Sequence, residues 1–434
     1  MKSAFFALAA VALGIALQLG DGGLTPGALG LLTAALIALV ASTQVGGELD
    51  ERGIAVLLAA GCAVEGLLLF TRPPGIYLEP RPGGPYPYWA GLALLLAFAL
   101  LGARQEAPRW QLPLLLAVHF ALGAWVLWSS PAPLIDVFTF QRDAMVHALQ
   151  GHNPYAMTFE DPYGGRFPFY GEGLLRDGRV QVGYPYPPLC FALGLVAHLL
   201  AGDYRWAVLL SITLSAACIA WAQPDRAGRL AAALLLLSPR GFFVVEQGWT
   251  DPYVLLLACA VALCAVRFRR ALPWMLGAFL AVKQYAVLAL PLVVFIERRP
   301  WRLLRNALLF AAALTLPLAL LDLRAFLDDV VLFQIRQPFR PDALSYSAAL
   351  FSKTGRALPS WAPLATLAAG IWLALRSMPR APASLAGAMA LCYCAFFSVG
   401  KQAFCNYYFF VLGLAACAAA LTAPSARSPG IAPS

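Results

Sequence analysis

The chain has 434 residues, of which 61% are hydrophobic and 12% charged, and its formal net charge is +9. This composition leaves too little polar surface to solvate a water-soluble globule of such length, so a soluble domain is excluded and a bilayer is the natural solvent. The positive charge would suit nucleic acid, but the basic residues follow the ends of apolar blocks, as the positive-inside rule predicts. We therefore expect membrane lipids, and no nucleic acid, among its partners.

Apolar blocks recur along the chain at close to the ~20 residues that cross ~30 Å of hydrocarbon as a helix. The first five lie near 3–19, 27–44, 53–70, 88–102 and 111–129. The others lie near 188–201, 204–221, 228–241, 252–266, 271–282, 284–296, 304–321, 361–375, 384–398 and 404–421. Because lipid offers no hydrogen-bond partner to a backbone, we predict an all-α polytopic integral membrane protein of roughly 12 to 14 transmembrane helices.

Basic residues in the short loops indicate the orientation of the chain. Arginines gather in four loops, at Arg104 and Arg109, at Arg267, Arg269 and Arg270, at Arg298, Arg299, Arg302 and Arg305, and at Arg376 and Arg380. We predict that these loops are cytoplasmic in a cell inner or plasma membrane. The long loops 130–187 and 322–360 are then expected on the outer side, each with an amphipathic interfacial helix.

Three apolar blocks between 188 and 241 would join two outer loops under this orientation, and an odd number of crossings cannot do that. One of these blocks is therefore predicted to be a half-span. We divide the chain into N-terminal extra transmembrane helices (1–105), a main transmembrane module (106–421) and a disordered tail (422–434). The nine cysteines show no metal-site spacing, so we expect no metal and no cofactor, while a pair between Cys190 and Cys405 stays open.

The first long loop carries the most informative residues, beginning with Asp136 at the point where the chain leaves the membrane. A helix is expected from there to about Gln150. On a helical wheel, Asp136, Thr139, Asp143, His147 and Gln150 share one face, and Val137, Phe138, Ala144, Met145, Ala148 and Leu149 share the other. This pattern is typical of an amphipathic helix at a membrane surface. Asp143 and His147 alone do not define a metal site.

Several polar residues have a plain structural interpretation beside a functional one. Tyr184 and Tyr186, which stand among prolines where the chain re-enters the membrane, are typical of an interfacial aromatic belt. Lys283 and Lys401 are typical of lysines that snorkel from a helix end, or of lysines that bind an anion. Glu65, His119 and His198 lie inside apolar blocks and are expected to be structural hydrogen-bonding groups.

The motifs GHNPY at 151–155, YPYPPL at 184–189 and EQGWTD at 246–251 follow Asp136 in order. Lys283 comes next, ahead of Leu290 and Pro291, and Asn406, Tyr407 and Tyr408 follow Lys401. This set, which covers about 136–410, resembles the GT-C membrane glycosyltransferases. It is most similar to the polyprenyl-phosphate-mannose-dependent mannosyltransferases of glycosyltransferase family 87. The first four predicted helices lie outside the region of likeness.

The resemblance implies an inverting transfer of a sugar, with mannose favoured by the likeness, from a polyprenyl-phosphate donor to a hydroxyl of a glycolipid or glycan acceptor at the outer membrane face. Asp136 is then the expected general base, because a carboxylate must take the acceptor proton. The expected donor-binding residues are Lys283, Lys401, His147, Gln247, Asp251, Tyr184, Tyr186 and Arg336. The expected acceptor-binding residues are Asp143, Asn153, Tyr155, Asn406 and Tyr407.

Two other classes compete with this hypothesis. A transporter or flippase for lipids or lipid-linked sugars would place its site near the bilayer midplane at broken helices, and Lys283 between two short apolar blocks fits that description. Against it, the sequence shows no internal repeat, and most candidate residues lie in the long outer loops. A membrane scaffold without enzymatic activity would leave the ordered motifs unexplained.

Overall fold

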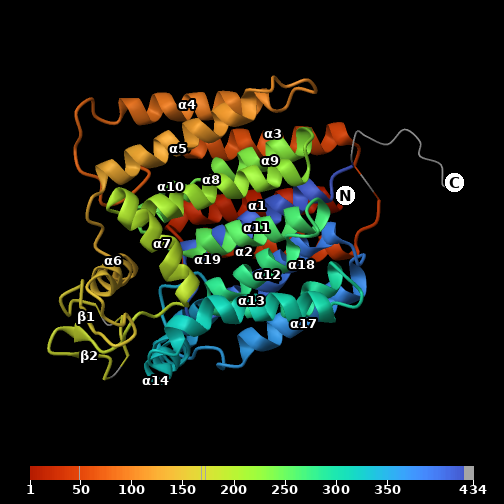
Figure 1. Cartoon of the computed structure of the whole chain (residues 1–434). Helices are drawn as coiled ribbons and strands as arrows, with labels where there is room; N and C mark the ends of the chain where they lie inside the picture. Colours follow the sequence, from red (N-terminus) through yellow and green to blue (C-terminus); the bar gives the residue numbers. More distant parts are fainter. Residues whose placement is uncertain (48, 168, 172, 425–434) are drawn as a thin grey trace.

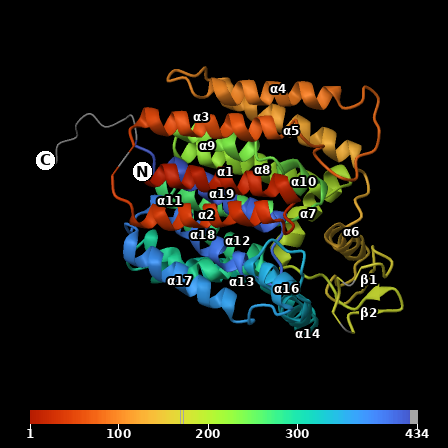
Figure 2. The same ribbon diagram turned by 180° about the vertical axis from the view of Figure 1, so that it is seen from behind.

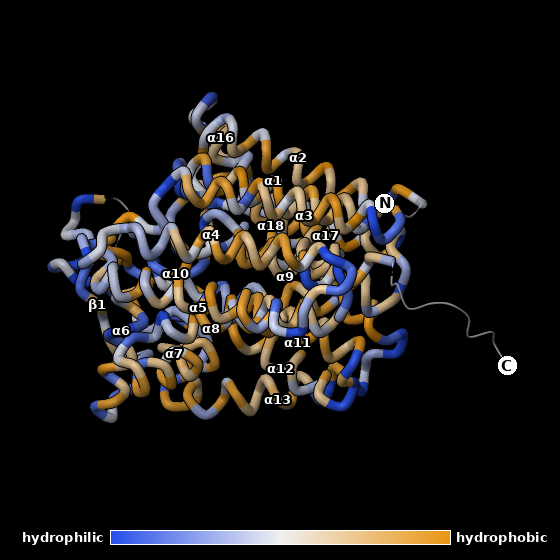
Figure 3. Tube along the Cα trace, turned by 90° about the horizontal axis from the view of Figure 1, so that it is seen from above, coloured by the Kyte–Doolittle hydropathy of each residue, from blue (hydrophilic) through white to orange (hydrophobic). Residues whose placement is uncertain are grey.

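The computed structural model describes residues 1–424 except 48, 168 and 172, and this part of the chain is a bundle of helices that run roughly side by side (Figure 1). The segments 130–187 and 322–360 gather at one end, called here the loop end, whereas the chain begins at the opposite end. Apolar residues cover the middle of the bundle and polar residues gather at its two ends (Figure 3). The all-helical prediction is confirmed, and the pattern is that of a membrane protein.

The bundle contains α1 (Lys2–Gly20), α2 (Pro26–Gln44), α3 (Glu51–Leu68), α4 (Tyr86–Leu101), α5 (Gln111–Ser129), α7 (Pro188–Ala201), α8 (Arg205–Ala222), α9 (Arg226–Leu236), α10 (Gly241–Glu246), α11 (Asp251–Val266), α12 (Leu272–Val282), the 3-10 helix η1 (Gln284–Phe295), α13 (Trp301–Ala319), α17 (Ala362–Ser377), α18 (Pro382–Ser398) and α19 (Cys405–Leu421). Among the described residues, 5 helices are long and apolar enough to cross a membrane, namely α1, α2, α5, α8 and α13. The other apolar helices are shorter, so the expected total of spans and the GT-C likeness stay predictions.

The loop end is built from short elements. The first long loop contains α6 (Asp136–Leu149) and the strands β1 (Phe159–Glu160), β2 (Leu175–Arg176) and β3 (Arg179–Val180), which pair antiparallel in the order β1-β3-β2. In the second long loop, α14 (Leu323–Leu327), the π-helix η2 (Asp328–Leu332) and α15 (Phe333–Arg336) follow one another without a break, and α16 (Tyr346–Thr354) comes later. Both loops thus contain the predicted helices. The small sheet was not predicted, because two-residue strands give no alternating pattern.

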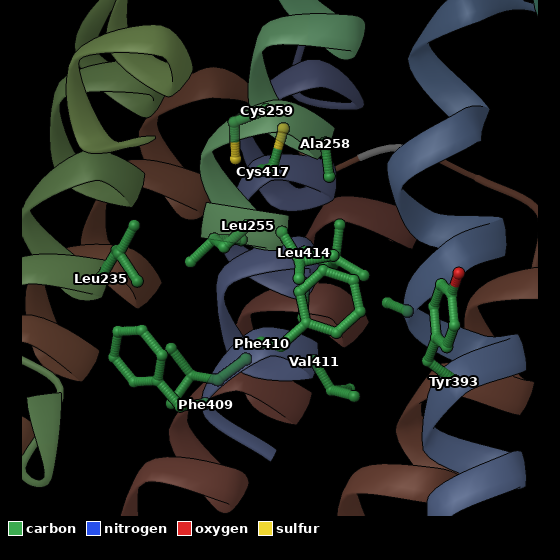
Figure 4. Close-up of a cluster of buried hydrophobic side chains, with 14 of the residues drawn as sticks. Leu235, Leu255, Ala258, Cys259, Tyr393, Phe409, Phe410, Val411, Leu414 and Cys417 are labelled. Carbon is green, nitrogen blue, oxygen red and sulfur yellow. The ribbon is translucent and has the colours of Figure 1, made fainter. Parts of the chain in front are cut away.

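The core of the bundle surrounds α19, which packs against α1, α9, α11 and α18. Leu255 and Cys259 of α11 face Leu414 and Cys417 of α19 in a cluster of buried side chains (Figure 4). Gly413 allows this close approach, because a Cβ there would lie 2.5 Å from Cδ2 of Leu255. All nine cysteines are free and buried, so the pair that the sequence left open between Cys190 and Cys405 does not form.

Both ends of α7 lie at the loop end, which is the arrangement expected of the predicted half-span, and the membrane topology stays a prediction. The first residue of this helix, Pro188, follows Tyr186 of the loop-end cavity described below. Beyond its last residue, the Tyr204 hydroxyl donates to the Gly248 carbonyl at 2.8 Å, and Arg205 donates to the Glu246 carbonyl at 3.1 Å. The next helix, α8, therefore starts from the same end as α7. With α7 placed in this way, two crossings rather than three would join the two outer loops that the sequence predicts on either side of this region.

The two faces of α6 differ from the helical-wheel prediction. Thr139, which was assigned to the polar face, is buried, and Leu149, which was assigned to the apolar face, is 52% exposed. The reason is that α6 is covered from two sides. Phe138 packs against Tyr204 at the start of α8, with ring centroids 5.9 Å apart, and Phe140 packs against Phe159 of β1 at 4.6 Å. The strands therefore bury an arc that the wheel assigns to water or headgroups.

The segments predicted as separate, 1–105 and 106–421, pack against each other. Helix α1 lies between α2 and α3 (Figure 2) and contacts α19 along its length. At the loop end, the Leu24 backbone N–H donates to the Asp342 carbonyl at 2.9 Å, and Gly23 pairs with Ala343 in an isolated β-bridge. Of the tail predicted at 422–434, residues 425–434 lie outside the described residues.

Candidate functional site

A cavity of about 1250 Å³ opens at the loop end of the bundle. Its wall comes from the α1–α2 turn, the α3–α4 loop, the start of α6, the α12–η1 junction, residues 333–342 and the segment before α19. The polar side chains on this wall are Asp21, Thr25, Tyr77, Asp136, Tyr163, Tyr186, Gln247, Lys283, Gln284, Tyr285, Gln334, Gln337, Arg340, Asp342, Ser347, Ser360, Lys401, Gln402, Asn406 and Tyr407. The volume exceeds the ≈ 300–1,000 Å³ typical of small-molecule sites, so a large ligand fits.

Asp136 lies on the cavity wall at the first turn of α6. Its Oδ1 accepts a hydrogen bond from the Val137 backbone N–H at 2.7 Å, and its own backbone N–H donates to the Tyr163 hydroxyl at 3.2 Å. Burial raises the pKa of the Asp136 carboxyl, while the Val137 N–H and the positive charge of Arg340 act in the opposite direction. A carboxylate that binds a proton more tightly than usual is a better general base.

Arg205 fixes α6, and with it Asp136, on the bundle. Its side chain is buried and its Nη2 lies 2.7 Å from Oδ2 of Asp203. The guanidinium also lies over the ring of Phe138, 4.9 Å from its centroid, and donates to the Glu246 carbonyl at 3.1 Å. One buried cation therefore connects α6, α8 and α10, which explains how α6 holds its first residue in place.

The floor of the cavity is formed around the carboxylate of Asp251, the first residue of α11. Its Oδ2 accepts from Lys283 Nζ at 2.8 Å and from Asn406 Nδ2 at 2.6 Å, and its Oδ1 accepts from the Tyr285 hydroxyl at 2.5 Å. Lys283 occupies the extended residue between α12 and η1, so the break in the helix brings its ammonium to the site. Such a buried ion pair is stable only with these additional hydrogen bonds.

Three tyrosine rings surround the ammonium of Lys283. Its Nζ lies 5.4 Å from the ring centroid of Tyr186, 5.5 Å from that of Tyr285 and 5.8 Å from that of Tyr407. Each ring offers its negative face to the cation. The three rings therefore help Asp251 to hold the ammonium at the base of the cavity.

Two more cations, Arg340 and Lys401, line the same cavity. Arg340 donates to both carboxylate oxygens of Asp342, at 2.8 and 2.7 Å, and its guanidinium lies between the rings of Phe169 and Phe404, 3.8 and 4.8 Å from their centroids. The ammonium of Lys401 donates to the backbone carbonyls of Ile335 and Gln337, at 2.8 and 2.6 Å. Burial lowers the pKa of Lys401.

Seven of the residues predicted from sequence share this cavity, namely Asp136, Gln247, Lys283, Lys401, Asn406, Tyr407 and Tyr186. Asp251 lies directly beneath them. Three others lie behind the wall and support it. The Tyr184 hydroxyl donates to Oε1 of Gln141 at 3.0 Å, the Tyr155 hydroxyl donates to the Tyr186 carbonyl at 3.0 Å, and Oδ1 of Asn153 accepts from the Tyr155 backbone N–H at 3.0 Å.

Three predicted residues do not come to the cavity. Asp143 forms an ion pair with the neighbouring Arg142 at 2.7 Å, and His147 stacks on His152 with ring centroids 4.8 Å apart. Arg336 is half-exposed and pairs with Asp328 at 3.0 Å, whereas Arg340, four residues later, lines the wall. Asp143 and His147 were placed on the Asp136 face by the helical wheel, but α6 turns that face out of the cavity after its first turn.

Several residues of the site were missed. Tyr285 could have been found from its position two residues after Lys283, but Asp21 lies in the N-terminal segment, outside the motifs. Glu246 is the first residue of the EQGWTD motif and was given no role of its own. Its carboxylate instead accepts from the backbone N–H groups of Ile76 and Tyr77, at 2.8 and 2.9 Å, and so holds the α3–α4 loop in the cavity wall. No pattern in the sequence pointed to that contact.

Two of the buried ionisable residues that we expected to be structural lie outside the cavity lining. His119 Nδ1 is 3.1 Å from the Thr213 hydroxyl, and its ring stacks on Phe242. Glu65 is fully buried in α3, and a Cβ on Gly14 would lie 2.1 Å from its Oε1. In the described residues, no group of three or more His, Cys, Asp or Glu side chains is placed to hold a metal ion.

Comparisons of the chain with protein-family models, with curated proteins and with solved structures found no match. The cavity wall brings together a carboxyl group with a raised pKa and the cations Lys283, Arg340 and Lys401. Such a set of residues can remove a proton from one substrate group while it binds a neighbouring anionic group.

Proposed function

We propose that this protein is a GT-C-type membrane glycosyltransferase that transfers a sugar, with mannose favoured by the motif likeness, from a polyprenyl-phosphate donor to a hydroxyl of a lipid-linked or glycan acceptor. The observation that supports this proposal best is the convergence of Asp136 with Lys283 and Arg340 on one cavity. A base and several cations are what such a transfer requires, because the acceptor loses a proton while the donor releases a phosphate.

In the proposed reaction, the Asp136 carboxylate takes the proton of the acceptor hydroxyl. The hydroxyl oxygen attacks the anomeric carbon of the donor, and a new C–O bond forms as the bond from that carbon to the phosphate oxygen breaks. The polyprenyl phosphate leaves with the electron pair, and the configuration at the anomeric carbon inverts. Lys283 at the floor and Arg340 on the wall supply positive charge for the departing phosphate.

The apolar part of the cavity suits the lipid portion of such a donor. Leu358, Pro359 and Leu364, before and at the start of α17, line the cavity together with Leu24 and Phe396. Leu364 is 57% exposed, so this apolar wall is continuous with the outer surface of the helices. An amphiphile could therefore place its charged group among the cations and leave its chain in the bilayer.

The sidedness of the charges is consistent with a site on the outer face. Helix α11 begins in the cavity floor at Asp251 and runs away from it, so the arginine-rich turn at 267–270 lies at the opposite end of the bundle. By the positive-inside rule, that end is cytoplasmic. The proposed site then faces the periplasm or the cell exterior, where a lipid-linked donor rather than a nucleotide sugar would be the substrate.

A second candidate function is the transport of a lipid-linked sugar across the bilayer. One observation favours it, which is the buried pair of Lys283 and Asp251 at the break between α12 and η1. Discontinuous helices of this kind form substrate sites in many transporters. We rank it second because most polar residues of the cavity come from loop segments and helix ends at the loop end rather than from the middle of the bundle.

The test is sugar transfer from radiolabelled polyprenyl-phosphate-mannose to membrane lipids by the purified protein in nanodiscs. Asp136→Asn is compared with wild type and with Asp143→Asn, which removes a carboxylate of the same helix that lies outside the cavity lining. Transfer that is lost only in Asp136→Asn, with unchanged thermal unfolding, supports the proposal. Full transfer by Asp136→Asn would show that Asp136 is not the general base. If wild type flips the labelled lipid across the bilayer but transfers no sugar, the transporter is favoured.

A further inference from the structure

The segment 333–340, called here the roof segment, covers the cavity and carries one of its cations. Phe333, Gln334, Ile335, Gln337, Phe339 and Arg340 all line the cavity. The segment comprises α15 and the irregular residues that follow it, and α15 continues from the π-helical stretch η2. Beyond Gln337, its backbone leaves the helix, so its position depends on contacts with other parts of the chain.

Those contacts come mainly from the turn before α19. Lys401 Nζ donates to the Ile335 and Gln337 carbonyls at the C-terminal end of α15, at 2.8 and 2.6 Å. Nε2 of Gln402 donates to the Pro338 carbonyl at 3.0 Å. A cation that satisfies the last carbonyls of a helix is favourable both as a charge-assisted donor and through the helix dipole. Two of the three N–H groups of the Lys401 ammonium thus donate hydrogen bonds to backbone carbonyls.

The same turn also fixes Arg340. Its backbone N–H donates to the Lys401 carbonyl at 3.0 Å. Its guanidinium is oriented by Asp342 and held between the rings of Phe169 and Phe404. The side chain reaches the same wall as Asp136, whose pKa its charge lowers. Arg340 is therefore presented to the cavity as a planar cation with a defined orientation.

We propose that Lys401 is a positioning residue that holds the roof segment in place, and that Arg340, presented by that segment, is the cation of the wall that binds the anionic group of the substrate. The role of Lys401 stands on the substrate-free geometry alone. The identity of the anionic group as a lipid phosphate rests on the proposed function. These roles differ from a direct phosphate contact by Lys401, which its sequence position suggested.

Hydrogen–deuterium exchange of the substrate-free protein in nanodiscs tests the role of Lys401. In Lys401→Met, we expect the backbone amides of 335–337, 339 and 340 to exchange roughly 10-fold faster, because charge-assisted hydrogen bonds to two carbonyls are lost. Exchange in the buried core helix α19 should not change, which shows that the variant is folded. Lys401→Arg keeps a cation with several donors and should restore most of the protection. Lys353→Met, which removes an exposed lysine of α16, is the matched control.

Binding of a polyprenyl monophosphate lipid to the same proteins tests the role of Arg340. We expect Arg340→Met to weaken binding roughly 10-fold or more. Lys401→Met should also weaken it, and Lys401→Arg should recover it in parallel with the recovery of slow exchange. Exchange at wild-type rates in Lys401→Met would overturn the positioning role, and so would weakened binding without faster exchange. A wild type that does not bind the lipid counts against the proposed function, while the exchange data still decide the role of Lys401.

Discussion

Lys283 and Asp251 form an ion pair of 2.8 Å whose side chains are only 7% and 0% exposed. Neither residue could remain buried as a charged group without the other, because desolvation of a lone ion is costly. The pair joins the break after α12 to the start of α11, so the floor of the cavity depends on it. Its removal should therefore affect the stability of the fold as well as activity.

Lys283→Met should lower the free energy of unfolding by roughly 3–5 kcal/mol, because Asp251 is left as an unpaired buried charge. The double variant Lys283→Met/Asp251→Leu should recover part of this loss, since it buries no charge. Thermal unfolding in one detergent measures both. If the double variant has a lower free energy of unfolding than Lys283→Met, so that the two losses add, the pairing is contradicted.

The pH profile of transfer should show an acid limb set by Asp136. Because burial raises the pKa of this carboxyl, kcat/KM should fall as the pH decreases through a value above that of an ordinary aspartate. The charge of Arg340 lowers the same pKa, so Arg340→Met should move the limb to higher pH. Rates of transfer between about pH 4 and 8 check this, and a limb that moves to lower pH would exclude the coupling.

Glu246→Ala should release the α3–α4 loop from the cavity wall. The variant leaves the Ile76 and Tyr77 backbone N–H groups without their acceptor, at a cost of about 1–3 kcal/mol. Limited proteolysis should then cut this loop faster. Glu79→Ala, which removes an exposed carboxylate of the same loop, is the control. Equal cleavage of both variants would show that Glu246 does not hold the loop.

Asp329 should make stability depend on pH in a defined direction. Burial and the neighbouring charge of Asp328 raise its pKa from 3.8 to about 7, although the Gly183 N–H acts against this. The folded state therefore binds more protons than the unfolded state between these values, and the free energy of unfolding should fall as the pH rises from about 4 to about 7. Asp329→Asn should flatten this fall relative to wild type. Identical dependence of unfolding on pH in the variant and in wild type would refute the assignment.

Gly183→Ala should destabilise the contact between the two long loops. An added Cβ would lie 2.3 Å from Oδ2 of Asp329 and 2.3 Å from the Tyr155 carbonyl oxygen, so a segment must move, at a cost of roughly 1–3 kcal/mol. Gly30→Ala in α2 meets nothing within 4 Å and should be neutral or slightly stabilising. Thermal unfolding of the two variants provides the comparison, and equal midpoints would argue against tight packing at Gly183.

The helical character of the fold could be predicted because apolar blocks in lipid have one stable backbone arrangement. The need for a half-span also followed from the arginine pattern, but its assignment to α7 required the contacts of Tyr204 and Arg205 with the α10–α11 region. The buried arc of α6 could not be predicted, because it is set by β1, whose two residues leave no periodic signal.

The candidate site was partly predictable for a similar reason. Asp136, Lys283 and Asn406 stand beside prolines, glycines or helix ends that mark them in the sequence. Tertiary contacts decide the rest. In the sequence, Lys401 appears as a free cation, yet its ammonium donates to two backbone carbonyls. The sequence also does not show which of Arg336 and Arg340 reaches the cavity, because the turn after α15 decides the direction of each side chain.

The cavity wall runs from Gly20 at the end of α1 to Tyr407 in α19. The two segments that carry these residues also approach each other closely, since a Cβ on Gly22 would lie 2.2 Å from the Cys405 backbone nitrogen. During synthesis, α1 emerges long before its partner α19. A nascent chain without α19 lacks part of the floor and the centre of the core, so it carries no complete site until α19 has been made.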